Sequence, residues 1–306
     1  MKKLGSITVV TDSNVDRLHG DKFVASLADR AERVERIVFP AGEKSKTLET
    51  YCELVRGFAA LGMTRSDVAY ALGGGVVGDL TGFAASTYMR GIGFVQVPTT
   101  LLAMVDSSIG GKTGVDVPEG KNLVGAFHAP LEIIRNYAFL ETLPEREMKN
   151  GFAEMIKTAI LFDAELFALL KSRPTGEKFH RAIERCAELK ARIVEEDFRE
   201  RGKRKLLNLG HTFGHAFEKL SDYTLSHGEA VAMGLRVVGR DIPEIGEILD
   251  AYGFAAYDGK DSSEVVKAIM MDKKRTFDKV TLIVPKRIGE CEMVETPIAE
   301  LERMLK

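Results

Sequence analysis

Short β-branched runs alternate with amphipathic segments in the first half of the chain. Residues 45–62 and 76–91 place apolar side chains at helical spacing. Runs rich in Val and Ile between and around them predict strands over residues 6–12, 34–40, 67–74, 93–99 and 131–136. Strands that alternate with helices form a parallel sheet with covering helices. We therefore expect an α/β fold at the N-terminus, beginning with a strand.

The pattern becomes helical from about residue 144. Apolar positions near a 3.6-residue period predict helices over residues 143–162, 179–202, 211–220, 228–239 and 263–274. One late β-branched run, residues 279–285, predicts a strand. A length of 306 residues also favours two domains. We place the boundary at ETLPERE, with an α/β domain over 1–143 and a mostly α-helical domain over 144–306.

Composition narrows the class of protein. A hydrophobic share of 45% with 29% charged residues is typical of soluble globular proteins. The net charge of −2 does not favour nucleic acid as a partner. No apolar run reaches the roughly 20 residues of a membrane span, and no cleavage site follows the N-terminal apolar run. Cys52, Cys186 and Cys291 are scattered, which favours a reducing cytoplasm and buried, unpaired thiols.

A glycine-rich turn follows the third predicted strand. In DVAYALGGGVVGDLTGF, Gly73, Gly75 and Gly78 have the G-x-G-x-x-G spacing between a strand and a helix. This context predicts a dinucleotide site, since the backbone and the helix N-terminus can approach a pyrophosphate; a tight structural turn is the alternative. The acidic residue expected about 20 positions later is absent. Asp12 or Glu43, each just past a strand, could bind the ribose instead.

A second glycine stretch, DSSIGGKTG, invites comparison with a P-loop. Asp106 stands where the P-loop requires its first glycine, which excludes that motif and a phosphotransferase built on it. Lys112 then lies as an isolated cation on a flexible loop, and Lys121 follows closely. Lysines among glycines suit an anion or a carbonyl oxygen, although solvated loop lysines are an equal alternative.

Three of the six histidines lie within one short segment. His211 and His215 share a helix face, as in zinc-binding helices, and His227 opens another helix. Histidines with one carboxylate form a good divalent-metal site, and Glu154 and Glu229 are both candidates for the carboxylate. Core or surface histidines are the alternative. Nearby cations suggest an anionic, oxygen-rich substrate: Lys157, Lys190, Arg204, Lys273 and Lys274.

Several long blocks together resemble the 3-dehydroquinate synthase family. They include GGGVVGDLTGFAASTYMRG, VPTTLLAMVDSSIGGKTGVD, GKNLVGAFHAP, GFAEMIK, LLNLGHTFGHAFE and HGEAVAMG. The resemblance implies an NAD-binding α/β domain, a helical domain that binds metal and substrate, and a cytoplasmic homodimer. It also implies NAD and zinc or cobalt as cofactors. The implied reaction converts 3-deoxy-D-arabino-heptulosonate 7-phosphate to 3-dehydroquinate and phosphate by transient oxidation, elimination, reduction and aldol closure.

Position by position, the resemblance implies three sets of site residues. The metal ligands would be Glu154, His211 and His227, with His215 facing the substrate. The implied NAD contacts are Asp12, Asn14, Gly42, Glu43, Lys46, Gly74, Gly75, Val76, Val77, Gly78, Asp79, Thr99, Thr100, Lys112, Lys121, Phe139, Leu140, Glu141 and Thr142. The implied catalytic and substrate contacts are Asp106, Lys112, Asn122, Glu154, Lys157, Lys190, Arg204, Asn208, His215, Lys273 and, from the neighbouring subunit, Arg90. Lys157 and His215 are the candidates for proton transfer.

Three alternative functions are open at this point. A metal- and NAD-dependent polyol dehydrogenase of the glycerol dehydrogenase type would share the architecture, and a related sugar phosphate cyclase would share most of the site. A non-catalytic NAD-binding protein would have lost a ligand or a substrate cation, and none is lost here.

Overall fold

The computed structural model describes residues 4–222, 224–258, 261–272 and 279–306. Contacts within the chain divide it into two compact units, residues 1–144 and 145–306. Lys273 and Lys274, two of the cations singled out above, lie outside the described residues. Among the residues that are described, no helix is both long enough and apolar enough to cross a bilayer.

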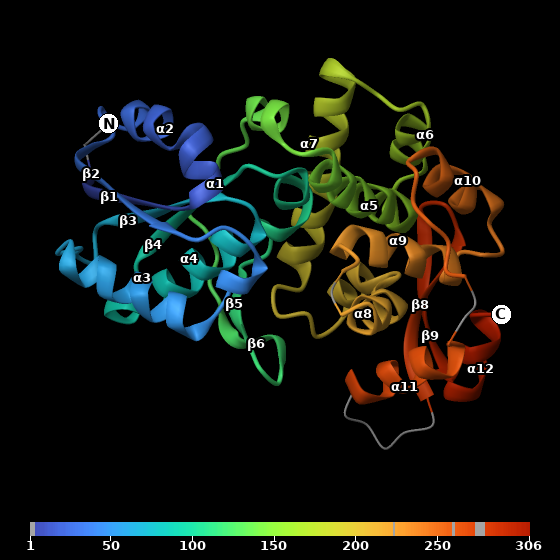
Figure 1. The fold of residues 1–306 in the computed structure, drawn as a ribbon. Helices are drawn as coiled ribbons and strands as arrows, with labels where there is room; N and C mark the ends of the chain where they lie inside the picture. The colour runs from blue at the N-terminus through green and yellow to red at the C-terminus, as the bar shows by residue number, and fades with distance from the viewer. Residues whose placement is uncertain (1–3, 223, 259–260, 273–278) are drawn as a thin grey trace. The chain divides into compact units, whose positions relative to one another are not determined.

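Unit 1 is built on a five-stranded parallel sheet, which confirms the α/β prediction. The strand order is β2-β1-β3-β4-β7 (Figure 1). The strands are β1 (Leu4–Asp12), β2 (Ala31–Phe39), β3 (Val68–Gly73), β4 (Gly93–Pro98) and β7 (Glu132–Ile133). The central strands are buried because helices cover both faces, and they are mostly apolar; Thr8 and Thr11 of β1 and Gln96 of β4 are buried polar exceptions. The order reverses between β1 and β3, and ligands of open α/β sheets bind at the carboxyl ends of the strands at such a point.

Helices cover both faces of this sheet (Figure 1). One face carries α1 (Ser13–Val15) and α2 (Asp21–Ser26), joined by the turn η1 (Asp16–Gly20). The other carries α3 (Leu48–Ala60) and α4 (Gly75–Thr87). Short helical turns complete the unit: η2 (Glu43–Ser45), η3 (Tyr88–Arg90), η4 (Ala103–Ser107) and η5 (Tyr137–Thr142). The helix expected to continue to residue 91 ends at Thr87, because Met89 and Arg90 adopt positive φ angles of 50° and 69°.

The loop predicted around Lys112 is instead a strand, so that prediction was wrong. Residues Lys112–Val117 (β5) pair antiparallel with Gly120–Phe127 (β6). Glycines allow the two strands of this hairpin to pack closely, since a Cβ on Gly125 would lie 2.0 Å from the Thr113 carbonyl oxygen. The glycine content that suggested a flexible loop therefore marks close strand packing.

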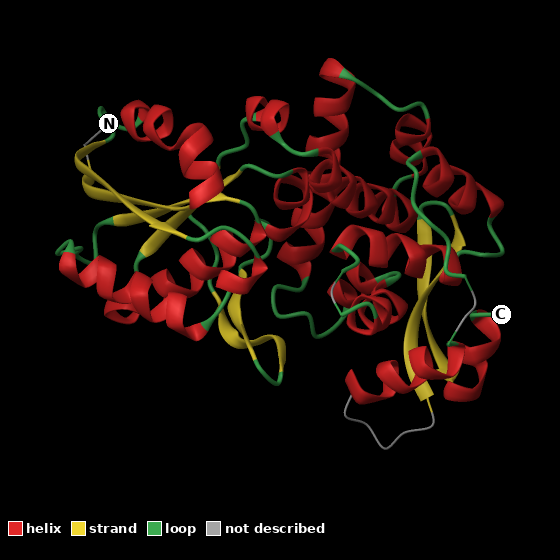
Figure 2. Cartoon of the chain, in the orientation of Figure 1, coloured by secondary structure: helices red, strands yellow, loops and turns green. Residues whose placement is uncertain are grey.

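Unit 2 is mostly helical, as expected, with one β-ribbon (Figure 2). Five predicted helices are present: α5 (Glu145–Phe162), α7 (Gly176–Glu196), α8 (His211–Leu220), α9 (His227–Val238) and α11 (Ser262–Asp272). Four further helical elements of unit 2 were not predicted: α6 (Ala164–Lys171), η6 (Lys203–Asn208), α10 (Pro243–Ala251) and α12 (Ile298–Met304). The predicted strand β8 (Lys279–Arg287) pairs antiparallel with β9 (Glu290–Pro297).

One strand and one helix end of unit 2 differ from the prediction, each for a physical reason. Strand β9 was not predicted because nearly all its side chains are exposed, so it lacks a buried apolar face. Helix α7 ends six residues early, because Asp197 caps the following loop. Its carboxylate accepts the N–H groups of Arg201 at 2.9 Å and Gly202 at 2.7 Å.

Candidate active site

Three helices of unit 2 each contribute one potential metal ligand. Glu154 lies in the middle of α5 and is fully buried, whereas His211 and His227 are the first residues of α8 and α9. One ligand atom from each residue lies within 4.8 Å of the others. Among the described residues this is the one group of three or more such side chains, and it includes neither His215 nor Glu229.

Both histidines are oriented with the same nitrogen toward the carboxylate. Nε2 lies 3.7 Å from Glu154 Oε1 in His211 and 3.2 Å in His227. The other nitrogen of each ring faces an acceptor: Nδ1 of His211 lies 3.1 Å from the Leu209 carbonyl oxygen, and Nδ1 of His227 lies 3.7 Å from the Glu218 carboxylate. Outer acceptors of this kind fix the ring orientation of metal-binding histidines.

Glu218 is a site residue that the sequence analysis missed. It is buried, and it lies seven residues after His211, two turns along the same helix. That spacing was a usable signal, because a buried carboxylate on the histidine face of a helix requires a partner. Its partner is His227 on the neighbouring helix.

Burial and neighbouring charges shift the pKa of each of these three groups. Burial raises the pKa of Glu154, but the Lys157 ammonium and both histidines outweigh it and hold the pKa well below its usual range. Burial and Lys157 lower the pKa of His211 to about 3. For His227, burial lowers the pKa, but Glu154 and Glu218 outweigh it and raise the pKa to about 9. A metal ion would therefore meet an ionised Glu154 and a neutral His211, and would displace a proton from His227.

Glycines allow α8 and α9 to approach closely enough to bring these ligands together. A Cβ on Gly234 would lie 2.0 Å from the Gly210 carbonyl oxygen, and one on Gly214 would lie 3.0 Å from the Ala230 carbonyl oxygen. The two helices are thus packed backbone against backbone. Substitution by any larger residue at these positions would separate His211 from His227.

The remaining predicted residues of unit 2 divide by exposure. Lys157, Lys190 and Arg204 are buried, with Lys157 paired to Glu154 and Arg204 donating to the Phe198 carbonyl oxygen at 2.6 Å. Asn208 is exposed and donates to Glu200 at 2.8 Å. His215 is also exposed, with its ring centroid 5.4 Å from that of His211. Buried cations can form strong, charge-assisted hydrogen bonds with an anion.

In unit 1 the predicted cofactor residues gather at the carboxyl edge of the sheet. Asp12 ends β1, Gly74 follows β3, and Thr99 follows β4, with the Thr99 N–H donating to the Gly73 carbonyl oxygen at 2.9 Å. The turn between β2 and α3 carries Gly42, Glu43 and Lys46. In this structure Asp12 caps α1, accepting the N–H groups of Asn14 and Val15 at 2.9 and 3.0 Å.

Two glycines after β3 are each required by a different close neighbour. A Cβ on Gly74 would lie 3.0 Å from Thr100 Cγ2, and one on Gly78 would lie 2.7 Å from the Gln96 side chain. Helix α4 begins at Gly75, followed by Val76 and Val77, so its first N–H groups lie at this edge of the sheet. Free N–H groups at the start of a helix that follows such a turn can bind a phosphate.

A buried lysine connects this turn to the β5–β6 hairpin. Lys46 Nζ donates to Asp79 Oδ2 and to Asn122 Oδ1, each at 2.6 Å. Burial lowers the pKa of Lys46, but the Asp79 carboxylate outweighs it and raises the pKa above its usual value. The structure thereby joins two predicted cofactor residues to a predicted substrate residue.

The other predicted residues of unit 1 are distributed over its turns. Asp106 lies in η4, Lys112 is exposed at the start of β5, and Lys121 Nζ lies 3.9 Å from the Glu43 carboxylate. The predicted segment Phe139, Leu140, Glu141 and Thr142 forms η5. His19 was missed by the sequence analysis, and its Nε2 lies 2.8 Å from Thr142 Oγ1. It belongs to a turn with no periodic pattern, so no sequence signal marked it.

The chemical types of the three potential ligands of unit 2 indicate which metal ion they fit. One carboxylate and two imidazoles match the ligand set of catalytic zinc sites and leave coordination positions open for substrate. The outer partners Leu209 and Glu218 complete the pattern. These residues fit a divalent transition metal.

The fold is that of several solved sugar-phosphate cyclases. A 2-deoxy-scyllo-inosose synthase solved with carbaglucose-6-phosphate, NAD+ and Co2+ matches with a TM-score of 0.89 and 25% identity, covering 99% of this chain and 90% of that chain. The 2-epi-5-epi-valiolone synthase of Streptomyces hygroscopicus subsp. jinggangensis 5008, solved with NAD+ and Zn2+, matches with a TM-score of 0.89, 29% identity and the same coverage. Glycerol dehydrogenase from Schizosaccharomyces pombe shares only the fold, at 16% identity and a TM-score of 0.60.

Sequence comparison identifies the family within this class. The models of the 3-dehydroquinate synthase N-terminal and C-terminal regions match residues 36–150 and 151–275. The 3-dehydroquinate synthase of Prochlorococcus marinus (strain MIT 9211) is 40% identical, over 100% of this chain and 88% of its own. That of Xylella fastidiosa (strain M12) is 45% identical over 83% of this chain and 76% of its own. The chain belongs to the 3-dehydroquinate synthase family.

Proposed function

We propose that this chain is a 3-dehydroquinate synthase. It converts 3-deoxy-D-arabino-heptulosonate 7-phosphate to 3-dehydroquinate and phosphate, a phosphate elimination followed by ring closure. Family membership supports this function. The observation that carries it in the structure is the set of Glu154, His211 and His227, with buried cations on the same unit.

The cofactors are NAD and a divalent metal ion, zinc or cobalt. We assign NAD to unit 1, with its pyrophosphate at the turn Gly74–Asp79 and its adenosine half near Asp12, Asn14, Glu43 and Lys46. The reversal of strand order between β1 and β3 supports this assignment, because nucleotides bind at such points. We assign the metal to Glu154, His211 and His227 of unit 2. When bound, NAD supplies a hydride acceptor and donor, and the metal supplies Lewis acidity.

The other residues would bind the substrate and move protons. Lys190 and Arg204 are buried cations, suited to the carboxylate and phosphate of the substrate. Asp106, Lys112, Asn122, Asn208 and the undescribed Lys273 would complete the contacts. Lys157 and His215 are our candidates for proton transfer, because both lie beside the metal ligands. Fixing one substrate conformer in this way can lower the barrier by several kcal/mol.

We further propose a homodimer in which Arg90 reaches the phosphate bound by the neighbouring subunit. Met89 and Arg90 both have positive φ, a conformation that costs non-glycine residues about 1–2 kcal/mol each. Such strain is concentrated at functional sites, which supports a role for Arg90. We place the protein in the cytoplasm, where its three free cysteines would stay reduced.

A turnover assay tests the function. Purified protein is incubated with the heptulosonate phosphate, zinc and sub-stoichiometric NAD. We expect phosphate and dehydroquinate in equal amounts over many turnovers, with no net NADH, because the hydride returns to the product. A polyol dehydrogenase would instead form one NADH per turnover and release no phosphate. Absence of phosphate release with both cofactors present would contradict the proposal.

A further inference from the structure

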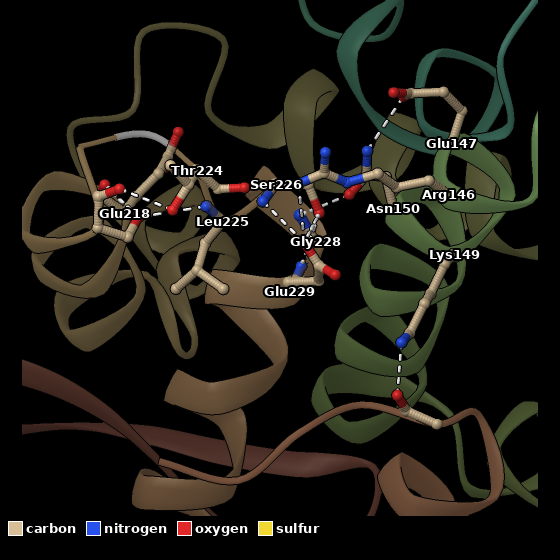
Figure 3. A network of polar contacts seen from close by, with 12 residues as sticks. Arg146, Glu147, Lys149, Asn150, Glu218, Thr224, Leu225, Ser226, Gly228 and Glu229 are labelled. Carbon is tan, nitrogen blue, oxygen red and sulfur yellow. Dashed lines mark hydrogen bonds and ion pairs between the residues drawn. The ribbon is translucent and has the colours of Figure 1, made fainter. Parts of the chain in front are cut away.

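Asn150 connects two of the helices that carry the metal ligands. It lies on α5, one turn before Glu154, and its side chain is buried. Its Oδ1 accepts the N–H of Gly228 at 3.1 Å, and Gly228 directly follows His227 on α9 (Figure 3). One side chain therefore ties the backbone beside one ligand to the helix that carries another.

The two helices are in direct backbone contact at this point. A Cβ on Gly228 would lie 2.5 Å from the Cα of Asn150 and 2.8 Å from its carbonyl oxygen. Any larger residue at 228 would therefore force α9 away from α5. The contact and the hydrogen bond together fix the position of the first turn of α9 against α5.

Neighbouring polar groups hold this arrangement in one orientation (Figure 3). The Asn150 amide donates through Nδ2 to Glu147 at 3.0 Å, which directs its oxygen at Gly228. Ser226 and Glu229 form a capping box at the start of α9. Arg146 donates to Glu229 at 3.3 Å and so attaches that cap to α5. The first turn of α9 is thus held to α5 at two points.

We propose that Asn150 is a positioning residue for the metal site. It sets the distance and angle between His227 on α9 and Glu154 on α5, whose ligand atoms lie 3.2 Å apart. The inference rests on the proposed function, because it takes these two residues as metal ligands. Asn150 acts on His227 through the backbone N–H of Gly228, the next residue in the chain.

Cobalt affinity tests this role against a purely structural one. Co2+ binding to the metal-free protein is measured by chelator competition, and the visible spectrum of bound Co2+ is recorded. Asn150→Ala should weaken binding by about 10–100-fold, as is typical for changes behind a ligand, and should alter the spectrum. The matched control is Lys149→Ala. Lys149 is adjacent on α5 but donates to the Gly253 carbonyl oxygen, which follows α10, and not to the first turn of α9 (Figure 3), so Co2+ affinity should be retained.

A double substitution guards against simple misfolding. The double variant Asn150→Asp with Glu147→Gln keeps an acceptor for the Gly228 N–H. Residue 147 then becomes the donor and residue 150 the acceptor in the hydrogen bond between them, and the net charge is unchanged. It should bind Co2+ more tightly than Asn150→Ala. The positioning role is overturned if the Co2+ affinity of Asn150→Ala stays within about twofold of the wild-type affinity. It is also overturned if the double variant binds Co2+ no more tightly than Asn150→Ala.

One more variant separates this inference from the ligand assignment. If His227→Ala keeps the wild-type Co2+ affinity, the metal ligands of the proposed function are wrong, and the role of Asn150 falls with them. If His227→Ala loses Co2+ while Asn150→Ala keeps it, the ligands stand and only the positioning role fails.

Discussion

Asp163 illustrates how one buried carboxylate stabilises a helix start. Its Oδ1 accepts the Leu166 N–H at 2.9 Å at the beginning of α6, and its Oδ2 accepts from Nε of Arg185 at 2.7 Å. Burial raises the pKa of Asp163, but these hydrogen bonds outweigh it and hold the pKa below its usual range. A folded pKa below the unfolded value of about 3.9 means that the stabilisation is complete above that pH. It is lost as the pH falls through the folded pKa.

We therefore predict a pH-dependent effect of Asp163→Asn. The substitution keeps an acceptor for Leu166 but removes the charge that faces Arg185. Since Arg185 is 43% exposed and screened by water, the loss should be only about 1 kcal/mol at pH 7. Urea unfolding between pH 7 and pH 3 should show the difference from wild type shrinking toward acid. Glu244→Gln, which removes an exposed carboxylate from the start of α10, controls for net charge. A difference that is constant with pH would count against this account.

At the scale of elements, burial explains some of the predictions but not all, since α6 and α10 were missed although each buries apolar side chains. The sheet strands were predictable because β-branched runs fill a core covered on both faces. Helices α5, α8 and α9 were predictable because apolar residues recur in each at helical spacing. Strand β9 lacks a buried face. The β5–β6 hairpin uses glycines for close packing, and composition alone suggested a loop there.

The histidines show a further limit of local patterns. Helical spacing pairs His211 with His215, whereas the structure places His211 and His227 around Glu154. Periodicity describes one helix face and contains no information about which helices touch. That grouping came from the family resemblance. The physical cause is visible only in the structure, in the glycines that let α8 meet α9.

The glycine contact between α8 and α9 leads to a prediction at this scale. Gly234→Ala would place a Cβ 2.0 Å from the Gly210 carbonyl oxygen, which is backbone and cannot rotate away. We expect a loss of stability of about 1–3 kcal/mol, typical of overpacking, together with weaker metal binding. Urea unfolding and Co2+ titration measure both.

The control is a glycine with free space in the same unit. At Gly246 in α10, a Cβ would meet only the Arg236 guanidinium, at 3.6 Å. Gly246→Ala should therefore be neutral or stabilising by up to about 1 kcal/mol, because alanine favours a helix interior. Equal losses at both positions would show that helix packing is not the cause.

At the scale of the whole molecule, the proposed reaction draws on both units. The residues that we propose for the cofactor belong to unit 1, and the proposed metal ligands with Lys157, Lys190 and Arg204 belong to unit 2. Each unit has its own core, so each can hold its set rigidly. The chain carries a net charge of only −2. The anion binding that we propose would therefore come from a few buried cations and not from the overall charge.

The dimer proposed above can be tested by mixing inactive variants. A subunit with Arg90→Ala cannot supply Arg90 to the phosphate site of its neighbour. A subunit with Lys157→Ala lacks Lys157 in its own site. In a mixed dimer, the Arg90→Ala subunit keeps Lys157 and receives Arg90 from the other chain, so one of the two sites is complete. Random equal mixing should restore about a quarter of wild-type phosphate release, since about half of the dimers are mixed.

The matching control is a mixture of Lys157→Ala with Lys190→Ala. Both residues lie in unit 2 and serve the site of their own chain, so no mixed dimer would hold a complete site. Unfolding and refolding each mixture together ensures exchange of subunits, and size-exclusion chromatography verifies dimers. Recovery with Arg90→Ala but not with Lys190→Ala requires that Arg90 act across the interface. Recovery in neither mixture would mean that Arg90 serves its own chain, because a site missing Arg90 would then have no other source of it.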